Sequence, residues 1–299
     1  MKRININRTI ILGILLLVAV VANAQQSAIV AADEFYQKKD FANAKTNIDA
    51  AIANPETSND AQAWQLRGYI YKAMYTKNER SNKRSPIRLE AFNSFKKSLS
   101  LDVNKELFTD NIKGVKFLLS TLFNDAAESL DPVDYKVAIE LFEKYKEFYK
   151  IVDPSPEAIL QKEIEFNVAL ASVYNTIIET DSRGSAKFVT LAKNIFLKIL
   201  AVEPDNISAN IGMAKLYYNQ AVYLIKIQEL DLDIVTLDGV LDNQVKLLRE
   251  ARPFMEKAYE LDPARPDAIE GLTGIYTGLN DEEKSRIFRE KLEKIKKPK

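Results

Sequence analysis

Residues 192–217, AKNIFLKILAVEPDNISANIGMAKLY, carry the pattern that decides the fold of this chain. The small residue Ala192 is followed four positions later by Phe196 and three positions after that by Ile199, and Pro204 comes shortly afterwards. Residues at these spacings lie on one face of a helix, and a small side chain lets two helix backbones approach closely where they cross. Because proline cannot continue a helix, the segment predicts one helix that ends just before Pro204 and a second that follows it.

The same spacing recurs along most of the chain, as Ala44, Ile48, Ala51 and Pro55, as Ala91, Phe95 and Ser98, and as Ala251, Met255, Ala258 and Pro263. A second cue, an apolar or small pair followed by an aromatic residue, accompanies it at Trp64, Gly68 and Tyr71, at Met213, Ala214 and Tyr217, and at Leu272, Thr273 and Tyr276. Together these residues resemble the tetratricopeptide repeat, a helix–turn–helix unit of about 34 residues. The resemblance implies an all-α fold, an α-solenoid in which the repeats stack into a right-handed superhelix.

Helical periodicity predicts about twelve helices in about six hairpins. The expected pairs are 27–38 with 41–53, 59–76 with 86–101, 105–129 with 132–151, 155–181 with 184–203, 207–229 with 238–261, and 265–279 with 281–297. Ile234-Val235-Thr236 is β-prone but too short and isolated to found a sheet. Two pairs depart from the motif spacing: extra residues fall near 77–86, and the fifth pair is lengthened, with an expected bend from Glu229 to Val240.

The first residues have the layout of a secretory signal peptide. Lys2, Arg3 and Arg8 precede an apolar run from Thr9 to Val21, and Ala22-Asn23-Ala24 supplies a small-x-small cleavage pattern. The run is shorter than the roughly 20 residues that span hydrocarbon, so the rival interpretation as a membrane anchor is disfavoured. We therefore expect residues 1–24 to be removed and residues 25–299 to form one repeat domain. We expect the protein to be exported to the periplasm; the alternatives are secretion from the cell and a peripheral location on the outer membrane. We expect no integral membrane segment after cleavage.

Composition excludes several chemistries. The chain has no histidine and no cysteine, so a Ser-His-Asp triad, a cysteine nucleophile and His- or Cys-ligated zinc are impossible. No glycine-rich phosphate loop is present, and the acidic residues Asp231, Asp233 and Asp238 lack the spacing of a calcium loop. Removing residues 1–24 takes away three basic residues and leaves a formal charge of about −3, which offers no bulk attraction for nucleic acid. We expect no catalytic residues, no metal and no cofactor.

The resemblance implies that a ligand lies in the concave groove lined by the first helix of each repeat. The motif register places on that face Gln65, Tyr69, Lys72, Lys215, Tyr218 and Asn219, together with Gln62, Ser208 and Ile211. Amide, aromatic and cationic groups of this kind suit an extended peptide backbone. The alternative is that these residues are ordinary exposed helix positions.

The insertion at 77–88 is a second candidate surface, because Arg80, Lys83 and Arg84 make it basic. It would suit an anionic partner. A solvated loop is the simpler interpretation, since no aromatic residue is interleaved to stack on a base or a sugar.

The leading hypothesis for function is a non-enzymatic exported scaffold that binds a protein or peptide partner in the cell envelope. The alternative is a solute- or glycan-binding protein, or a glycosidase that uses carboxylates alone, built on a helical-repeat core.

Overall fold

A computed structural model of the chain describes residues 28–180, 185–226 and 234–296. The expected signal peptide, residues 1–24, lies outside the described residues.

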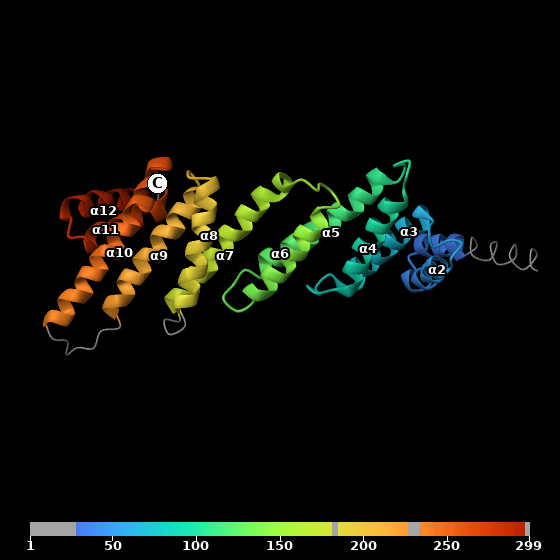
Figure 1. Ribbon diagram of the computed structural model, residues 1–299, viewed down its shortest axis with the longest axis horizontal. Helices are drawn as coiled ribbons and strands as arrows, with labels where there is room; N and C mark the ends of the chain where they lie inside the picture. The colour runs from blue at the N-terminus through green and yellow to red at the C-terminus, as the bar shows by residue number, and fades with distance from the viewer. Residues whose placement is uncertain (1–27, 181–184, 227–233, 297–299) are drawn as a thin grey trace, which may run out of the picture. The chain divides into compact units, whose positions relative to one another are not determined.

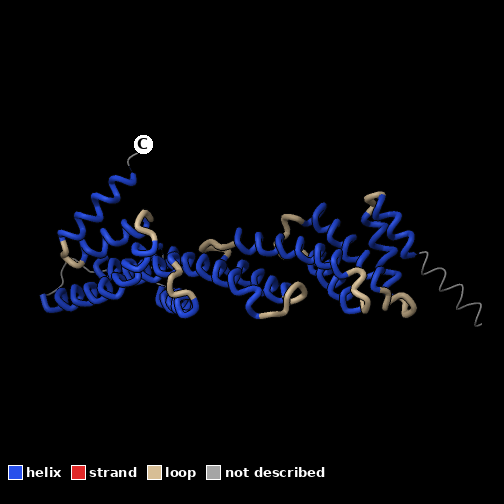
Figure 2. The backbone as a smooth tube through the Cα atoms, turned by 90° about the horizontal axis from the view of Figure 1, so that it is seen from above, coloured by secondary structure: helices blue, strands red, loops and turns tan. Residues whose placement is uncertain are grey.

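The described part of the chain contains helices and no strands, as the periodicity predicted (Figures 1 and 2). Residues 28–37 form a first helix. The elements that follow are α2 (Phe41–Ala53), α3 (Ala61–Met74), the π-helical turn η1 (Tyr75–Glu79), α4 (Pro86–Leu101), α5 (Phe108–Glu128), α6 (Tyr135–Tyr149), the 3-10 turn η2 (Pro156–Ile159), α7 (Leu160–Thr180), α8 (Ser185–Val202), α9 (Ile207–Lys226), α10 (Ile234–Leu261), α11 (Pro266–Gly278) and α12 (Glu282–Lys296).

Side-chain caps explain where several helices begin. The carboxylate of Asp60 accepts the backbone N–H of Gln62 at 2.7 Å and of Ala63 at 3.2 Å, which satisfies donors that α3 leaves without partners. Ser85 caps α4 in the same way, and Pro86 occupies the first position of that helix.

The expected bend from Glu229 to Val240 is wrong for its second half. Residues 234–240 belong to α10, and residues 227–233 lie outside the described part. The β-prone residues at 234–236 are therefore helical. Intrinsic propensity is a weak preference, and the close packing of α10 along α9 overrides it.

The chain divides into two compact units. Among the described residues, the first comprises residues 28–127 and 138–158, and the second comprises residues 128–137 and 159–296. In the second unit each helix from α7 to α12 packs on the next one, and α9 also contacts both α7 and α11. No helix among the described residues is long and apolar enough to cross a membrane.

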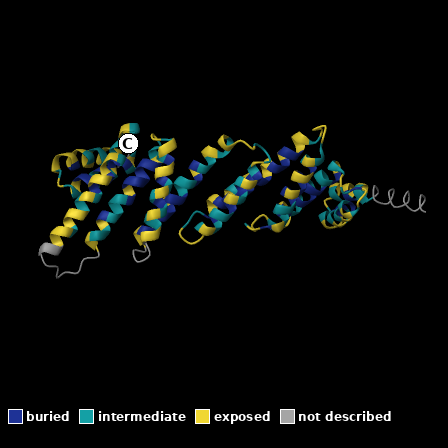
Figure 3. Cartoon of the chain, viewed as in Figure 1, coloured by how far each residue is buried: buried dark blue, intermediate teal, exposed yellow. Residues whose placement is uncertain are grey.

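The repeated sequence spacing marks the core of both units. The small and bulky motif residues are fully buried or nearly so, namely Ala44, Ile48, Ala51, Ala91, Phe95, Ser98, Ala192, Phe196, Ile199, Ala251, Met255 and Ala258. Figure 3 shows the resulting pattern, with buried residues on the sides of the helices that face one another and exposed residues on the outer sides.

Three of the four bulky motif residues, all except Ile48, pack against a glycine of another helix. The ring of Phe95 on α4 lies against Gly68 of α3 and Gly114 of α5, the ring of Phe196 on α8 against Gly212 of α9, and Met255 on α10 against Gly271 of α11. A Cβ atom at any of these glycines would lie within 2.2–2.7 Å of the facing side chain. The glycines therefore permit the close approach between consecutive helices.

Candidate functional site

A cavity of about 330 Å³ in the second unit is lined by α7, α9 and α11. These are the helices that the sequence analysis expected to line a groove. From α7 come Val168, Ser172, Asn175, Thr176 and Glu179, from α9 come Ser208, Ile211, Gly212 and Lys215, and from the start of α11 come Arg265 and Asp267.

Helical spacing brings these side chains together. On α9, Ser208, Ile211 and Lys215 stand three and four residues apart, so they share one face, as the motif register predicted. On α7, Ser172, Asn175 and Glu179 have the same spacing. The three faces meet because α9 contacts both α7 and α11.

Asn175 is the most unusual residue of the cavity. It is only 6% exposed, its amide nitrogen donates to the carbonyl of Gly212 at 3.1 Å, and its Oδ1 has no hydrogen-bond partner in the described part of the chain. A buried acceptor without a donor costs about 1–3 kcal/mol.

Some charged groups of the cavity already have hydrogen-bond or ion-pair partners and one does not. Arg265 pairs with Asp267 at 2.9 Å, and Glu179 accepts a hydrogen bond from the amide of Asn219 at 2.6 Å. Lys215 is exposed, and its ammonium group has no hydrogen bond or ion pair with any described residue. The cavity thus offers one cation that is free to contact a ligand.

The two other predicted residues of α9 lie beside the cavity and have packing roles. Tyr218 is half-buried, and its hydroxyl lies 2.8 Å from the position that a Cβ of Gly274 would occupy, so the ring fills space between α9 and α11. Asn219 holds Glu179 as described above. We therefore place Lys215 in the cavity and Tyr218 and Asn219 at its edge.

The predicted residues of α3 lie in the first unit, where they contact the start of α5. The Gln65 amide donates to the carbonyl of Leu107 at 3.5 Å, and the Tyr69 hydroxyl donates to the carbonyl of Asp110 at 2.9 Å. The Tyr69 ring also packs edge-on against Phe95. These contacts give Gln65 and Tyr69 a role in joining two helices.

Lys72 completes this cluster in the first unit. Its ammonium lies 4.8 Å from the centre of the Tyr69 ring and 5.2 Å from that of Phe117. Burial lowers the pKa of Lys72, because desolvation disfavours the charged form. The cation is therefore held over two rings and is less available to a ligand than Lys215.

The basic insertion is tied to the helices beneath it. Arg80 pairs with Asp125 at 3.1 Å, Arg84 pairs with Glu140 at 2.7 Å, and the carbonyl of Lys83 accepts a hydrogen bond from Arg88. Two of the three cations proposed for an anionic partner thus already have carboxylate partners, which reduces the charge that this surface presents.

Beneath the insertion lies an ion pair that the sequence did not predict. Arg88 is 1% exposed and Asp125 is 4% exposed; the two are paired, and Arg88 also donates to the hydroxyl of Tyr75 at 3.0 Å. Their positions 37 residues apart on α4 and α5 form no motif. Breaking a buried pair by removing one partner costs about 3–5 kcal/mol, so this pair fixes α4, α5 and η1 together.

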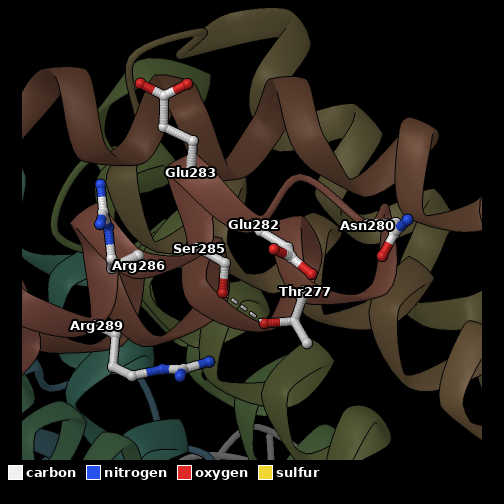
Figure 4. Close-up of a pocket in the computed structure, with 7 residues that line it drawn as sticks. All are labelled: Thr277, Asn280, Glu282, Glu283, Ser285, Arg286 and Arg289. Atoms are coloured by element: carbon white, nitrogen blue, oxygen red, sulfur yellow. Dashed lines mark hydrogen bonds between the residues drawn. The ribbon is translucent and has the colours of Figure 1, made fainter.

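A larger hollow of about 710 Å³ lies on the last hairpin (Figure 4). The hydroxyl of Ser285 is hydrogen-bonded to that of Thr277 at 2.7 Å, which joins α11 to α12. Figure 4 shows that the side chains of Glu283 and Arg289 point in different directions and do not converge on one point. Since two glutamates also occupy the first turn of α12, where the helix dipole would favour an anion, we assign no ligand to this hollow.

Among the described residues, no group of three or more acidic side chains is arranged to hold a metal ion. No protein-family model matches the chain, and no curated protein matches it.

Proposed function

We propose that this chain is a tetratricopeptide-repeat-like α-solenoid that binds an extended segment of a partner protein in the cavity between α7, α9 and α11, without catalysing a reaction. Its sequence also leads us to propose that it is exported and acts in the cell envelope.

The packing of the motif residues supports the repeat assignment. Phe196 and Met255 occupy the same motif position, and each lies against a glycine that follows it by 16 residues, whereas Phe95 lies against Gly114, which follows it by 19. In an ordinary helical bundle in which the alanines recur by chance, nothing would require the same 16-residue distance between the bulky residue and its glycine. First helices in contact with first helices, as in α7 with α9 and α9 with α11, are also what stacked hairpins require.

The single observation that carries the proposed binding is the composition of the cavity. Three helices converge on a hollow that combines the free cation of Lys215, the exposed side chain of Ser208 and the apolar wall of Ile211. An extended peptide supplies N–H donors at regular intervals, and its side chains alternate in direction. Such a ligand places an acidic or polar group near Lys215.

The glycosidase alternative has less support. A general acid needs a carboxyl group with a raised pKa. Hydrogen bonds from Arg84 lower the pKa of Glu140, and those from Asn206 and Gln161 lower the pKa of Glu203. In the cavity, Glu179 and Asp267 are both engaged by neighbouring donors.

A selected peptide tests this function. A library of random peptides would be selected against the purified protein, and the affinities of the enriched peptides measured by fluorescence anisotropy. Ser208→Trp with Lys215→Trp fills the cavity from two exposed positions, so we expect an affinity loss of about tenfold or more. Asn194→Trp with Lys198→Trp, at exposed positions of α8 in the same unit, is the matched control and should leave the affinity unchanged. Equal losses in both pairs, or none in either, would contradict the proposal.

A further inference from the structure

A second cavity, of about 500 Å³, lies in the first unit and has a different chemistry from the cavity between α7, α9 and α11. It is formed by the end of α4, the turn that leads into α5 and the end of α6. Its lining residues are Lys96, Leu99, Ser100, Asp102, Lys105, Phe108, Glu147, Lys150 and Ile151. The volume lies within the range typical of small-molecule sites.

The floor of this cavity is apolar and open to solvent. Phe108, at the first position of α5, is 44% exposed, and Leu99 and Ile151 are half-buried beside it. Three apolar side chains from three different elements thus face one hollow. Burial of this surface by an apolar ligand would be favourable.

Three lysines surround that floor. Lys96, Lys105 and Lys150 are all exposed, and none of their ammonium groups has a hydrogen bond or an ion pair with a described residue.

The acidic residues of the cavity form no ion pair with these lysines among the described residues. The two carboxylate oxygens of Asp102 accept the backbone N–H groups of Glu106 at 3.0 Å and Leu107 at 2.8 Å. These bonds hold the turn that carries Lys105, and they leave Glu147 as the one lining carboxylate without a backbone partner. With three lysines against two carboxylates, the lining keeps a net positive charge.

We infer that this cavity binds a single-chain anionic amphiphile of the fatty-acid class. The carboxylate contacts Lys96, Lys105 and Lys150, and the hydrocarbon chain covers Leu99, Phe108 and Ile151. A small hydrophilic anion would leave the apolar floor exposed, and a neutral hydrocarbon would leave the lysines without a partner. The cavity proposed to bind a peptide lies in the other unit, so this inference does not depend on it.

Isothermal titration calorimetry of the purified protein with laurate tests the inference. Two control ligands are dodecyltrimethylammonium, which has the same chain length and a cationic head, and acetate, which has the carboxylate and no long chain. We expect laurate to bind about one equivalent, and neither control ligand to compete for the site. Replacing the three lysines with glutamine should weaken laurate about tenfold, and Phe108→Ser should weaken it by a similar factor. Lys97→Gln with Lys116→Gln, at exposed lysines of the same unit outside the cavity, is the matched control and should have no effect.

Circular dichroism of each variant checks that the exposed substitutions leave the fold intact. Equal binding of laurate and the cationic amphiphile, or laurate binding that the lysine and Phe108 variants leave unchanged, would overturn the inference. A short acidic amphipathic peptide that displaces laurate and binds more tightly would overturn it in favour of a protein ligand.

Discussion

Replacing Gly212 with alanine tests a close helix contact of the second unit, that between α8 and α9. A Cβ atom at this position would lie 2.2 Å from Cζ and 2.4 Å from Cε1 of Phe196, whose side chain is fully buried. The ring is enclosed and cannot turn away without displacing its other neighbours. The added methyl group must therefore push α8 and α9 apart or distort the core.

Two effects of opposite sign set the magnitude. Inside a helix, alanine raises the free energy of unfolding by about 1 kcal/mol relative to glycine. Overpacking a core lowers it by about 1–3 kcal/mol. We expect Gly212→Ala to lower the free energy of unfolding by up to about 2 kcal/mol, the difference between those two terms. Gly239→Ala is the matched control, because Gly239 lies in α10 of the same unit and a Cβ there meets no atom within 4 Å. That variant should raise stability by about 0.5–1 kcal/mol.

Urea unfolding followed by circular dichroism measures both variants. Phe196→Leu in the Gly212→Ala background should recover part of the loss, since a smaller side chain makes room for the methyl group. The double-mutant cycle then reports a coupling between the two positions. Stabilisation of Gly212→Ala equal to that of Gly239→Ala, or additive effects of the two substitutions at 196 and 212, would refute the packing described here.

Three further predictions concern other contacts of the core. Ala192→Leu should cost about 1–3 kcal/mol, because Ala192 is fully buried at a helix crossing; a thermal shift near zero would contradict this. Tyr69→Phe should cost about 0.5–1.5 kcal/mol through loss of the bond to the carbonyl of Asp110, whereas an unchanged melting temperature would indicate that this bond contributes nothing. Burial alone would raise the pKa of Asp49, but hydrogen bonds from Lys45, Tyr71 and Arg67 outweigh it and lower that pKa. The stability that this carboxylate contributes is therefore present above the unfolded pKa of about 4 and is lost as the pH falls through the lower folded pKa. Asp49→Asn should therefore make the free energy of unfolding depend less on pH below about pH 4. An unchanged pH dependence in that range would contradict the prediction.

Local spacing predicted the helices and their buried faces well. Ala192, Phe196 and Ala251 are buried because a helical core follows the period of the helix, and that period is visible in the sequence. Of the glycines that receive the bulky residues, Gly68 belongs to the quoted motif, but Gly114, Gly212 and Gly271 were not predicted, although Gly212 and Gly271 stand at the same distance after their partners. A search for a second recurring spacing would have found them.

The binding residues could be predicted only in part. The motif register placed Lys215 on the face of α9 that lines the cavity, but Asn175 and Arg265 come from α7 and α11, and no local pattern connects them. Counting the same face along α7 would have reached Asn175. Gln65 and Tyr69 have backbone carbonyls as partners, which have no sequence signature, and Arg80 pairs with Asp125 at a separation of 45 residues. Such contacts depend on how helices pack, and the period of a single helix does not contain that information.

Hydrogen–deuterium exchange with a library-selected peptide tests the proposed binding site most directly. The amides of the protein would be compared with and without the peptide at saturation. We predict slower exchange in the parts of α7, α9 and α11 that line the cavity, residues 168–179, 208–215 and 265–267, and no change of exchange there in the Ser208→Trp, Lys215→Trp variant. Protection confined to the basic insertion at 77–88, with the three cavity segments unchanged, would contradict the account.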